Sequence, residues 1–181
     1  MFYLGIDSGT QSTKSIVLDL ETGSIVAQSS QVYDLIDGLP AGHLEQHPSD
    51  WVDAVRATIT DCLAQLGDRK SSLRGIGVSG QQHGLVVLDE NDEVVRPAKL
   101  WCDTSTTLPG YTIPKLLRLK QKEPENFAKT KGVLLPHDYL NFFLTGVKRM
   151  EFGDASGMGI LNIPKKTWET DLIDFVAPSV H

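Results

Sequence analysis

Short apolar segments separated by small polar turns open the chain. Residues 2–7, 14–19 and 24–32 are each predicted as a β-strand, and the turns between them contain Gly9 and Gly23. Turns this short join only neighbouring antiparallel strands. The pattern therefore predicts a three-stranded antiparallel meander at the start of the chain.

A helix and a fourth strand follow a polar loop over residues 37–47. Pro48 is a start signal for the helix and Gly67 is a stop signal. Between them, apolar residues recur at steps of three and four and form one stripe: Trp51, Val52, Val55, Ile59, Cys62, Leu63 and Leu66. The strand at residues 73–79 follows this helical crossover, so it is expected to lie parallel to the first strand.

Shorter elements are predicted in the second half of the chain. The predicted strands cover residues 85–88 and 94–100, and the predicted helices cover residues 114–122 and 136–145, the latter ended by Gly146. The tail from Lys165 is amphipathic and is interrupted at Pro178. The order of elements predicts an α/β fold of the ribonuclease H-like type, the unit that actin-like ATPases repeat: an antiparallel meander plus parallel strands with flanking helices.

Composition narrows the class of protein. The 181 residues are 40% hydrophobic and 22% charged, which is typical of a globular protein and is enough for a sizeable core. The net charge of −6 argues against a nucleic-acid-binding surface. No apolar segment reaches membrane-spanning length, and no signal peptide is visible. Cys62 and Cys102 form no disulfide framework, so we expect a cytoplasmic protein.

The first turn carries candidate chemistry. Asp7 ends an apolar strand, and glycine with several hydroxyl residues allows the backbone to approach an anion closely. A carboxylate would repel that anion unless a divalent cation lay between them, so the hairpin predicts a Mg²⁺-nucleotide phosphate site. It is not a Walker-type loop, because that motif is absent and no helix follows. Taken alone, the same residues are also ordinary turn formers.

Two further loops are expected to meet this hairpin. Residues 81–84 follow the fourth strand, and residues 101–103 follow the strand predicted at 94–100. Ligands of open α/β sheets gather at such carboxyl ends. Amide, imidazole and carboxylate groups suit a polyhydroxy compound, and an indole packs on the C–H face of a sugar. Taken singly, a loop histidine is more often structural and a tryptophan more often lies in the core.

Seven segments, taken together and in their order along the chain, identify a protein family more specifically than any one of them does. They are residues 5–10 with Lys14, 43–48 before Trp51, 76–84, 97–103, 109–116, 134–140 and 153–157. In these segments, which span essentially the whole chain, the protein resembles the N-terminal domain of FGGY carbohydrate kinases. The likeness is greatest to the branch that acts on xylulose. The resemblance implies ATP-dependent phosphorylation of a ketopentose, D-xylulose to D-xylulose 5-phosphate.

The resemblance also assigns roles to residues. Asp7 serves the Mg²⁺ site, directly or through water, and Gln82 and His83 hold the sugar in a pocket that Trp101 and Asp103 line. The residues that meet the ATP phosphates are Gly9, Thr10, Gln11, Ser12 and Thr13. Lys14 either adds positive charge near the phosphate or is a solvated strand residue. His137 and Asp154 match family segments without an assigned chemical role and are expected to be helix-cap and turn residues.

The chain departs from this family in two ways. The family has a second actin-like domain, which carries the adenosine-binding surface and the aspartate that acts as general base. No aspartate in this sequence matches that base, so residues 1–181 are expected to be the N-terminal, sugar- and phosphate-binding domain and to be inactive alone. A helical segment of the family is also missing between Thr107 and Leu108. The partners implied are ATP, a sugar and the missing domain, and a homodimer stays open.

Three alternatives remain at this point. The chain is a non-catalytic remnant that binds sugar or phosphate, a piece of a kinase for glycerol, gluconate or ribulose, or a fragment of an actin-like structural or chaperone ATPase. The last class shares the hairpin at Asp7 but does not need Gln82, His83 or Trp101 around a sugar.

Overall fold

The computed structural model describes residues 1–178 and 180, and these form two compact units. The first comprises Met1–Asp34 and Ser49–Gln81, and the second comprises Leu35–Pro48 and Gln82–His181. No helix in the described part of the chain is both long and apolar enough to cross a membrane.

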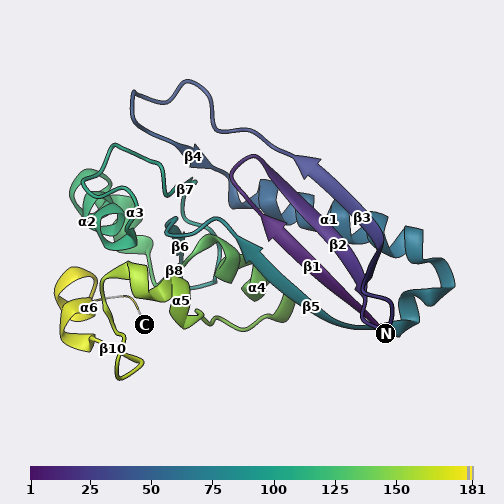
Figure 1. The fold of residues 1–181 in the computed structure, drawn as a ribbon. Coiled ribbons are helices and arrows are strands. Elements are labelled where there is room, and N and C mark those ends of the chain that lie inside the picture. Colours follow the sequence, from purple (N-terminus) through teal and green to yellow (C-terminus); the bar gives the residue numbers. More distant parts are fainter. Residues whose placement is uncertain (179, 181) are drawn as a thin grey trace. The chain divides into compact units, whose positions relative to one another are not determined.

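A four-stranded sheet forms the frame of the first unit. Its strands are β1 (Phe2–Ser8), β2 (Ser12–Asp19), β3 (Ser24–Val32) and β5 (Leu73–Gly80), in the spatial order β3-β2-β1-β5 (Figure 1). β2 lies antiparallel to both β1 and β3, whereas β5 is parallel to β1. The predicted meander and its returning parallel strand are thus confirmed.

Helix α1 (Pro48–Leu66) covers one face of this sheet. Thr58 on α1 accepts a hydrogen bond from Ser15 on β2 over 2.8 Å, and Trp51 and Cys62 are fully buried. Side chains alternate between the faces of a strand, so the buried residues of β1 lie on the α1 side: Phe2, Leu4, Ile6 and Ser8. The apolar stripe predicted for this helix is therefore confirmed as its core face, and Cys62 as a core residue. The 3₁₀ turn η1 (Gly67–Ser72) leads on to β5.

Short elements make up the second unit. In chain order they are β4 (Glu45–Gln46), β6 (Val86–Leu88), β7 (Ala98–Lys99), α2 (Thr112–Lys122), α3 (Pro124–Lys129), β8 (Gly132–Leu134), α4 (Pro136–Thr145), α5 (Phe152–Ala155), η2 (Ser156–Met158), β9 (Leu161–Asn162), β10 (Thr167–Trp168) and α6 (Thr170–Val176). The strands pair antiparallel as β4 with β7, β6 with β8 and β9 with β10. One core cluster joins the segment around β6 to α2 and α6 through Leu85, Val87, Leu116, Leu119, Val176 and Ala177.

Several predicted elements of this unit need correction. The strand predicted over 94–100 shrinks to β7, because Pro97 has no N–H to donate and the Arg96 side chain turns to Glu45 and Glu123. The loop predicted over 37–47 contains β4, and α3 and β8 were not predicted. Helix α4 is confirmed from end to end, with Gly146 at φ 71° as its left-handed cap.

Helix α6 and strand β10 form in the amphipathic tail. The break expected at Pro178 follows the end of α6 at Val176. Ser179 and His181 lie outside the described residues.

Candidate functional site

The hairpin between β1 and β2 presents Asp7 on the face of the sheet that α1 does not cover. Ile6 and its cross-strand partner Ser15 face the helix, so their neighbours Asp7 and Lys14 face the other way. On the other edge of β1, Asp7 pairs with Ser79 of the parallel strand β5. An exposed carboxylate therefore lies between a lysine and a serine at the end of the hairpin, and its oxygens are the kind of ligand that a hydrated Mg²⁺ ion takes.

Inward-facing hydroxyl groups hold the turn itself. The Gly9 N–H donates to the Ser12 carbonyl over 3.0 Å, and the Tyr33 hydroxyl donates to the Gly9 carbonyl over 2.6 Å. Thr13 donates to Ser8 over 3.0 Å, and both of these buried hydroxyls lie within 3.3 Å of the Tyr33 hydroxyl. The Thr13 hydroxyl thus supports the turn, and a contact of Thr13 with phosphate stays a prediction. Of the residues predicted to meet phosphate, Gln11 is exposed and Gly9, Thr10 and Ser12 are half-buried, so they remain candidates.

Replacing Tyr33 by phenylalanine is expected to lower the free energy of unfolding by about 1 kcal/mol, because the Gly9 carbonyl loses its donor. Urea denaturation measures this difference. Tyr3→Phe is the matched control and should change stability little, since the exposed Tyr3 hydroxyl donates a weak, 3.5 Å hydrogen bond to the Met1 sulfur. Equal stability losses in the two variants would contradict the role assigned to Tyr33.

The loop after β5 fixes His83 in a conformation that a non-glycine residue adopts rarely, with φ 55°. Three neighbours restrain it. Tyr111 stacks on the imidazole with ring centroids 6.4 Å apart, and the Thr112 hydroxyl donates to the His83 carbonyl over 3.3 Å. The ring also lies on the backbone of Gly157, where a Cβ atom would come within 2.1 Å of His83 Cε1. Such strained, over-determined positions cluster at functional sites.

Asp154 also contacts this histidine, which corrects an expectation from the sequence. Glu151, not Asp154, caps α5, because its side chain accepts the N–H groups of Gly153 and Asp154. His137 likewise makes no side-chain cap on α4. The buried Asp154 carboxylate instead has Oδ1 2.8 Å from His83 Nδ1 and Oδ2 3.4 Å from His137 Nδ1. Burial raises the pKa of Asp154, and the two imidazoles oppose this shift.

A second carboxyl group of this cluster, Asp138, titrates near neutrality. Its Oδ1 lies 3.4 Å from His137 Nε2 and accepts the Glu151 N–H. Burial raises the pKa of Asp138 to about 7, and the charges of Asp154 and Glu151 add to this effect. Near pH 7 the folded protein therefore holds a proton on Asp138 that an exposed aspartate would have lost.

Asp138→Asn is expected to remove a pH dependence of stability. Between pH 4 and 7 the folded wild type binds a proton at Asp138 that the unfolded chain has released, so its stability falls as pH rises through this window. The variant lacks this fall. The free energy of unfolding of the variant, relative to that of wild type, should therefore rise by about 2–4 kcal/mol between pH 4.5 and pH 8. Denaturant titrations at several pH values measure the gain, and parallel curves for the two proteins would contradict it.

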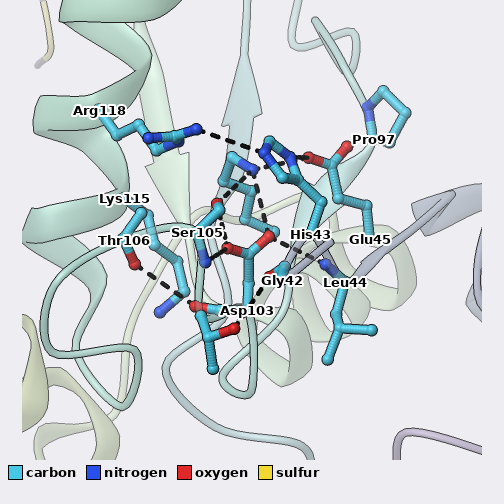
Figure 2. A network of polar contacts seen from close by, with 12 residues as sticks. Gly42, His43, Leu44, Glu45, Pro97, Asp103, Ser105, Thr106, Lys115 and Arg118 are labelled. Carbon is cyan, nitrogen blue, oxygen red and sulfur yellow. Dashed lines mark hydrogen bonds and ion pairs between the residues drawn. The ribbon is translucent and has the colours of Figure 1, made fainter. Parts of the chain in front are cut away.

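The third predicted loop carries one exposed and one buried candidate. Trp101 is 48% exposed, and Asp103 is fully buried. The Asp103 carboxylate accepts the Leu44 N–H over 3.1 Å and the Ser105 N–H over 2.9 Å (Figure 2). Burial opposes its charge, but the hydrogen bonds from Ser105 and Leu44 and the charge of Lys99 outweigh burial, so the pKa of Asp103 is lowered. These contacts give Asp103 a role in holding the loop, and a direct sugar contact stays a prediction.

A network of two carboxylates and two cations includes the buried Lys99 as one of its cations. The Lys99 ammonium lies 2.7 Å from Glu45 and 3.2 Å from Asp103, and Arg96 reaches Glu45 over 2.5 Å. His43 joins at 3.8 Å from Glu45 (Figure 2). The ligand atoms of His43, Glu45 and Asp103 are close enough together to hold a metal ion. Lys99 and Arg96 already balance the charges of the two carboxylates, so the cluster is an ion-pair network and not a metal centre.

The segment after Thr107 is tied down by another buried lysine. Lys115 on α2 donates to the carbonyls of Pro109 and Tyr111, the latter over 2.7 Å. Burial lowers the pKa of Lys115 to about 8, although the nearby charge of Asp103 works against this shift. Lys115 thereby fixes Tyr111, the residue that stacks on His83.

Two of the three predicted loops lie together in the second unit. The Leu85 N–H donates to the Lys99 carbonyl over 2.8 Å, so the residues after His83 run beside those before Trp101. Gln82 is exposed at the start of the first of these loops. The hairpin at Asp7 belongs to the other unit, and its meeting with the two loops stays a prediction.

Sequence reasoning missed the residues that restrain His83, namely Tyr111, Thr112, Asp154 and Gly157. A signal was present for all four, because Tyr111 and Thr112 belong to the segment 109–116 and Asp154 and Gly157 belong to the segment 153–157. Their partner His83 is 71 residues away along the chain from Asp154, so no local pattern joins them.

Comparison with known proteins agrees with these features. The model of the N-terminal domain of the FGGY family of carbohydrate kinases matches residues 2–108 and 104–181. Xylulose kinase of Haemophilus influenzae is 37% identical over 207 aligned residues, which cover 99% of this chain and 42% of that protein. Xylulose kinase of Lactococcus lactis is 38% identical, over 96% of this chain and 38% of its own length. The chain thus spans about two fifths of the relatives it matches.

Solved structures show the same fold. Xylulose kinase from Rhodospirillum rubrum superposes with a TM-score of 0.91 at 27% identity, covering 99% of this chain and 42% of that one. Gluconate kinase from Lactobacillus acidophilus superposes with a TM-score of 0.87 at 27% identity, covering 99% and 41%. These are sugar kinases of the actin-like ATPase fold, as the order of elements predicts. The chain therefore belongs to the FGGY family of carbohydrate kinases.

Proposed function

We propose that this chain is the sugar- and phosphate-binding part of a kinase that transfers a phosphoryl group from ATP to a ketopentose, D-xylulose. The observation that carries the proposal is the pair of loops in the second unit. There a restrained His83 with a partly exposed ring follows the exposed Gln82, beside the loop of Trp101. Hydrogen-bonding groups and an indole suit the two faces of a sugar. The similarity to xylulose kinases supports this choice of substrate.

For ATP and Mg²⁺ we propose the hairpin of the first unit. Its exposed Asp7 would hold Mg²⁺ directly or through water, and the turn at Gly9, Thr10 and Gln11 would face the phosphates. A bound Mg²⁺ ion would neutralise charge on the phosphoryl oxygens. The opposing Lys14 adds positive charge on the same face.

We further propose that the general base and the adenosine surface lie in a second domain that follows this chain in the complete protein. The relatives are more than twice as long as the chain, which supports this proposal. A family segment is also proposed to be absent between Thr107 and Leu108. The family model matches in two stretches that meet at residues 104–108, and Leu108 has a positive φ of 53°. The cytoplasm, where Cys62 and Cys102 stay reduced, is the proposed compartment.

A coupled assay with ATP, Mg²⁺ and D-xylulose tests the reaction. The chain alone should give no turnover above background, and the complete protein that contains it should turn over. Turnover by the isolated chain would overturn the placement of the base in a second domain. Absence of turnover in the complete protein, with sugar binding retained, would favour a non-catalytic remnant.

Gluconate is the second candidate substrate, because gluconate kinase from Lactobacillus acidophilus superposes nearly as well as xylulose kinase from Rhodospirillum rubrum does. A substrate panel of D-xylulose, D-ribulose, glycerol and gluconate in the same assay separates these candidates. We expect the highest kcat/KM with D-xylulose. A higher value with gluconate would make gluconate the proposed substrate instead.

A further inference from the structure

We propose that Asp154 positions His83, holding the Nδ1 side of the imidazole so that the opposite edge of the ring is presented to the sugar. This inference rests on the proposed function, since it concerns the histidine that we place against the ketopentose. Asp154 itself does not touch the reacting atoms and is a positioning residue.

Contacts on two sides of His83 support this role. Asp154 Oδ1 lies 2.8 Å from the ring at Nδ1, and its Oδ2 lies 3.4 Å from the backbone N–H of the same residue. One carboxylate therefore engages both the side chain and the main chain of His83. His83 has a positive φ, so this double contact holds a conformation that the loop would not favour unaided.

Burial shows which edge of the ring is turned inward. Nδ1 is shielded from solvent, whereas 26% of the His83 side chain is exposed. The exposed area therefore belongs to the rest of the side chain. A carboxylate at Nδ1 favours the tautomer with its proton there, which leaves Nε2 as an acceptor for a hydroxyl group.

The Asp154 carboxylate and the His83 imidazole are in contact, but their geometry is not that of a well-aligned hydrogen bond. Among the described residues, neither His83 Nδ1 nor Asp154 Oδ1 has a hydrogen-bond partner of good angle, although the two atoms are 2.8 Å apart. Hydrogen bonds in ligand-free sites are often poorly aligned and tighten when the substrate binds.

Further contacts keep the Asp154 carboxylate in place. His137 Nδ1 lies 3.4 Å from Oδ2 on its other side, and the Glu151 side chain holds the first turn of α5 by accepting the N–H of Asp154 itself. The backbone of Gly157 and the ring of Tyr111 limit where the imidazole can move. Asp154 is thus a fixed support for a histidine that is confined from several directions.

The test combines the tautomer of His83 with sugar affinity. Long-range ¹H–¹⁵N correlation spectra of the labelled chain report the protonated nitrogen of each histidine, and calorimetry reports the D-xylulose affinity. In wild type we expect the proton of His83 on Nδ1. Asp154→Asn should shift it toward Nε2 and weaken D-xylulose binding about tenfold or more, the lower end of the loss seen when a carboxylate behind a metal-binding histidine is removed.

Asp138→Asn is the matched control, because it removes a buried carboxyl group of the same cluster that contacts His137 and not His83. It should leave the His83 tautomer unchanged and the affinity within about twofold, a change of less than 0.5 kcal/mol. Gly157→Ala is a second variant that needs no change at Asp154. Its new methyl group would displace the His83 ring and should also weaken D-xylulose binding.

The outcomes separate this inference from the proposed function. If wild type binds no D-xylulose but shows the expected tautomer and its loss in Asp154→Asn, the positioning role stands and the proposed function falls. A proton on Nε2 in wild type, or an Asp154→Asn variant with unchanged tautomer and affinity, would overturn the inference. A changed tautomer with unchanged affinity would also overturn it, because the orientation of His83 would then not matter to the sugar.

Discussion

Replacing Glu45 by alanine is expected to lower the free energy of unfolding by about 3–5 kcal/mol, because it leaves buried charges without their partner. Glu45 lies 2.7 Å from the ammonium of Lys99, which is only 1% exposed, and 2.5 Å from the guanidinium of Arg96. Burial disfavours the carboxylate, but hydrogen bonds from these two cations outweigh burial and lower the pKa of Glu45. Denaturant-induced unfolding measures the loss.

One control defines the cause of this loss. Glu21→Ala removes an exposed ion pair with the N-terminal amine and should leave stability nearly unchanged. A loss below about 1 kcal/mol in Glu45→Ala, or an equal loss in Glu21→Ala, would contradict the role assigned to the network.

Replacing Asp7 by asparagine is expected to weaken binding of a metal–triphosphate at the hairpin by at least about tenfold, because the neutral amide is a much poorer ligand for a hard cation. Mn²⁺ with tripolyphosphate is a suitable probe for the chain alone, since it does not need an adenosine pocket. In wild type the paramagnetic Mn²⁺ ion should broaden the amide NMR resonances of Gly9, Thr10 and Gln11. In Asp7→Asn this broadening should require far more probe.

Asp19→Asn is the matched control for the hairpin, because Asp19 is a carboxylate of the same strand pair but lies at its opposite end, across from Phe2. It should leave the broadening unchanged. Equal loss in both variants would indicate general electrostatic attraction, and undiminished broadening in Asp7→Asn would remove Asp7 from the proposed metal site.

Local sequence patterns predicted those elements of the fold whose formation depends on residues within the element and its immediate flanks. The meander follows from short turns, and α1 follows from an apolar stripe between Pro48 and Gly67. Helix α4 was predicted from end to end because Pro136 starts it and Gly146 supplies its left-handed cap. In each case the signal lies within the element and its immediate flanks.

The parts that failed depend on distant partners. Strands β4 and β7 are two residues each and exist only through pairing between segments more than 50 residues apart, so neither has a periodic signal of its own. The contacts of Asp103 with Lys99 and with the N–H of Leu44, 59 residues earlier, were likewise not predicted, and its place in a sugar pocket stays a prediction. The link between Asp154 and His83 is of the same kind.

Calorimetric titration of the chain with D-xylulose is a direct test of the sugar site, because sugar binding requires neither the base nor the adenosine surface. We expect saturable binding that His83→Ala weakens about tenfold or more and that is tighter than binding of glycerol or gluconate. No measurable binding of D-xylulose, or equal binding in wild type and His83→Ala, would contradict the proposed sugar site.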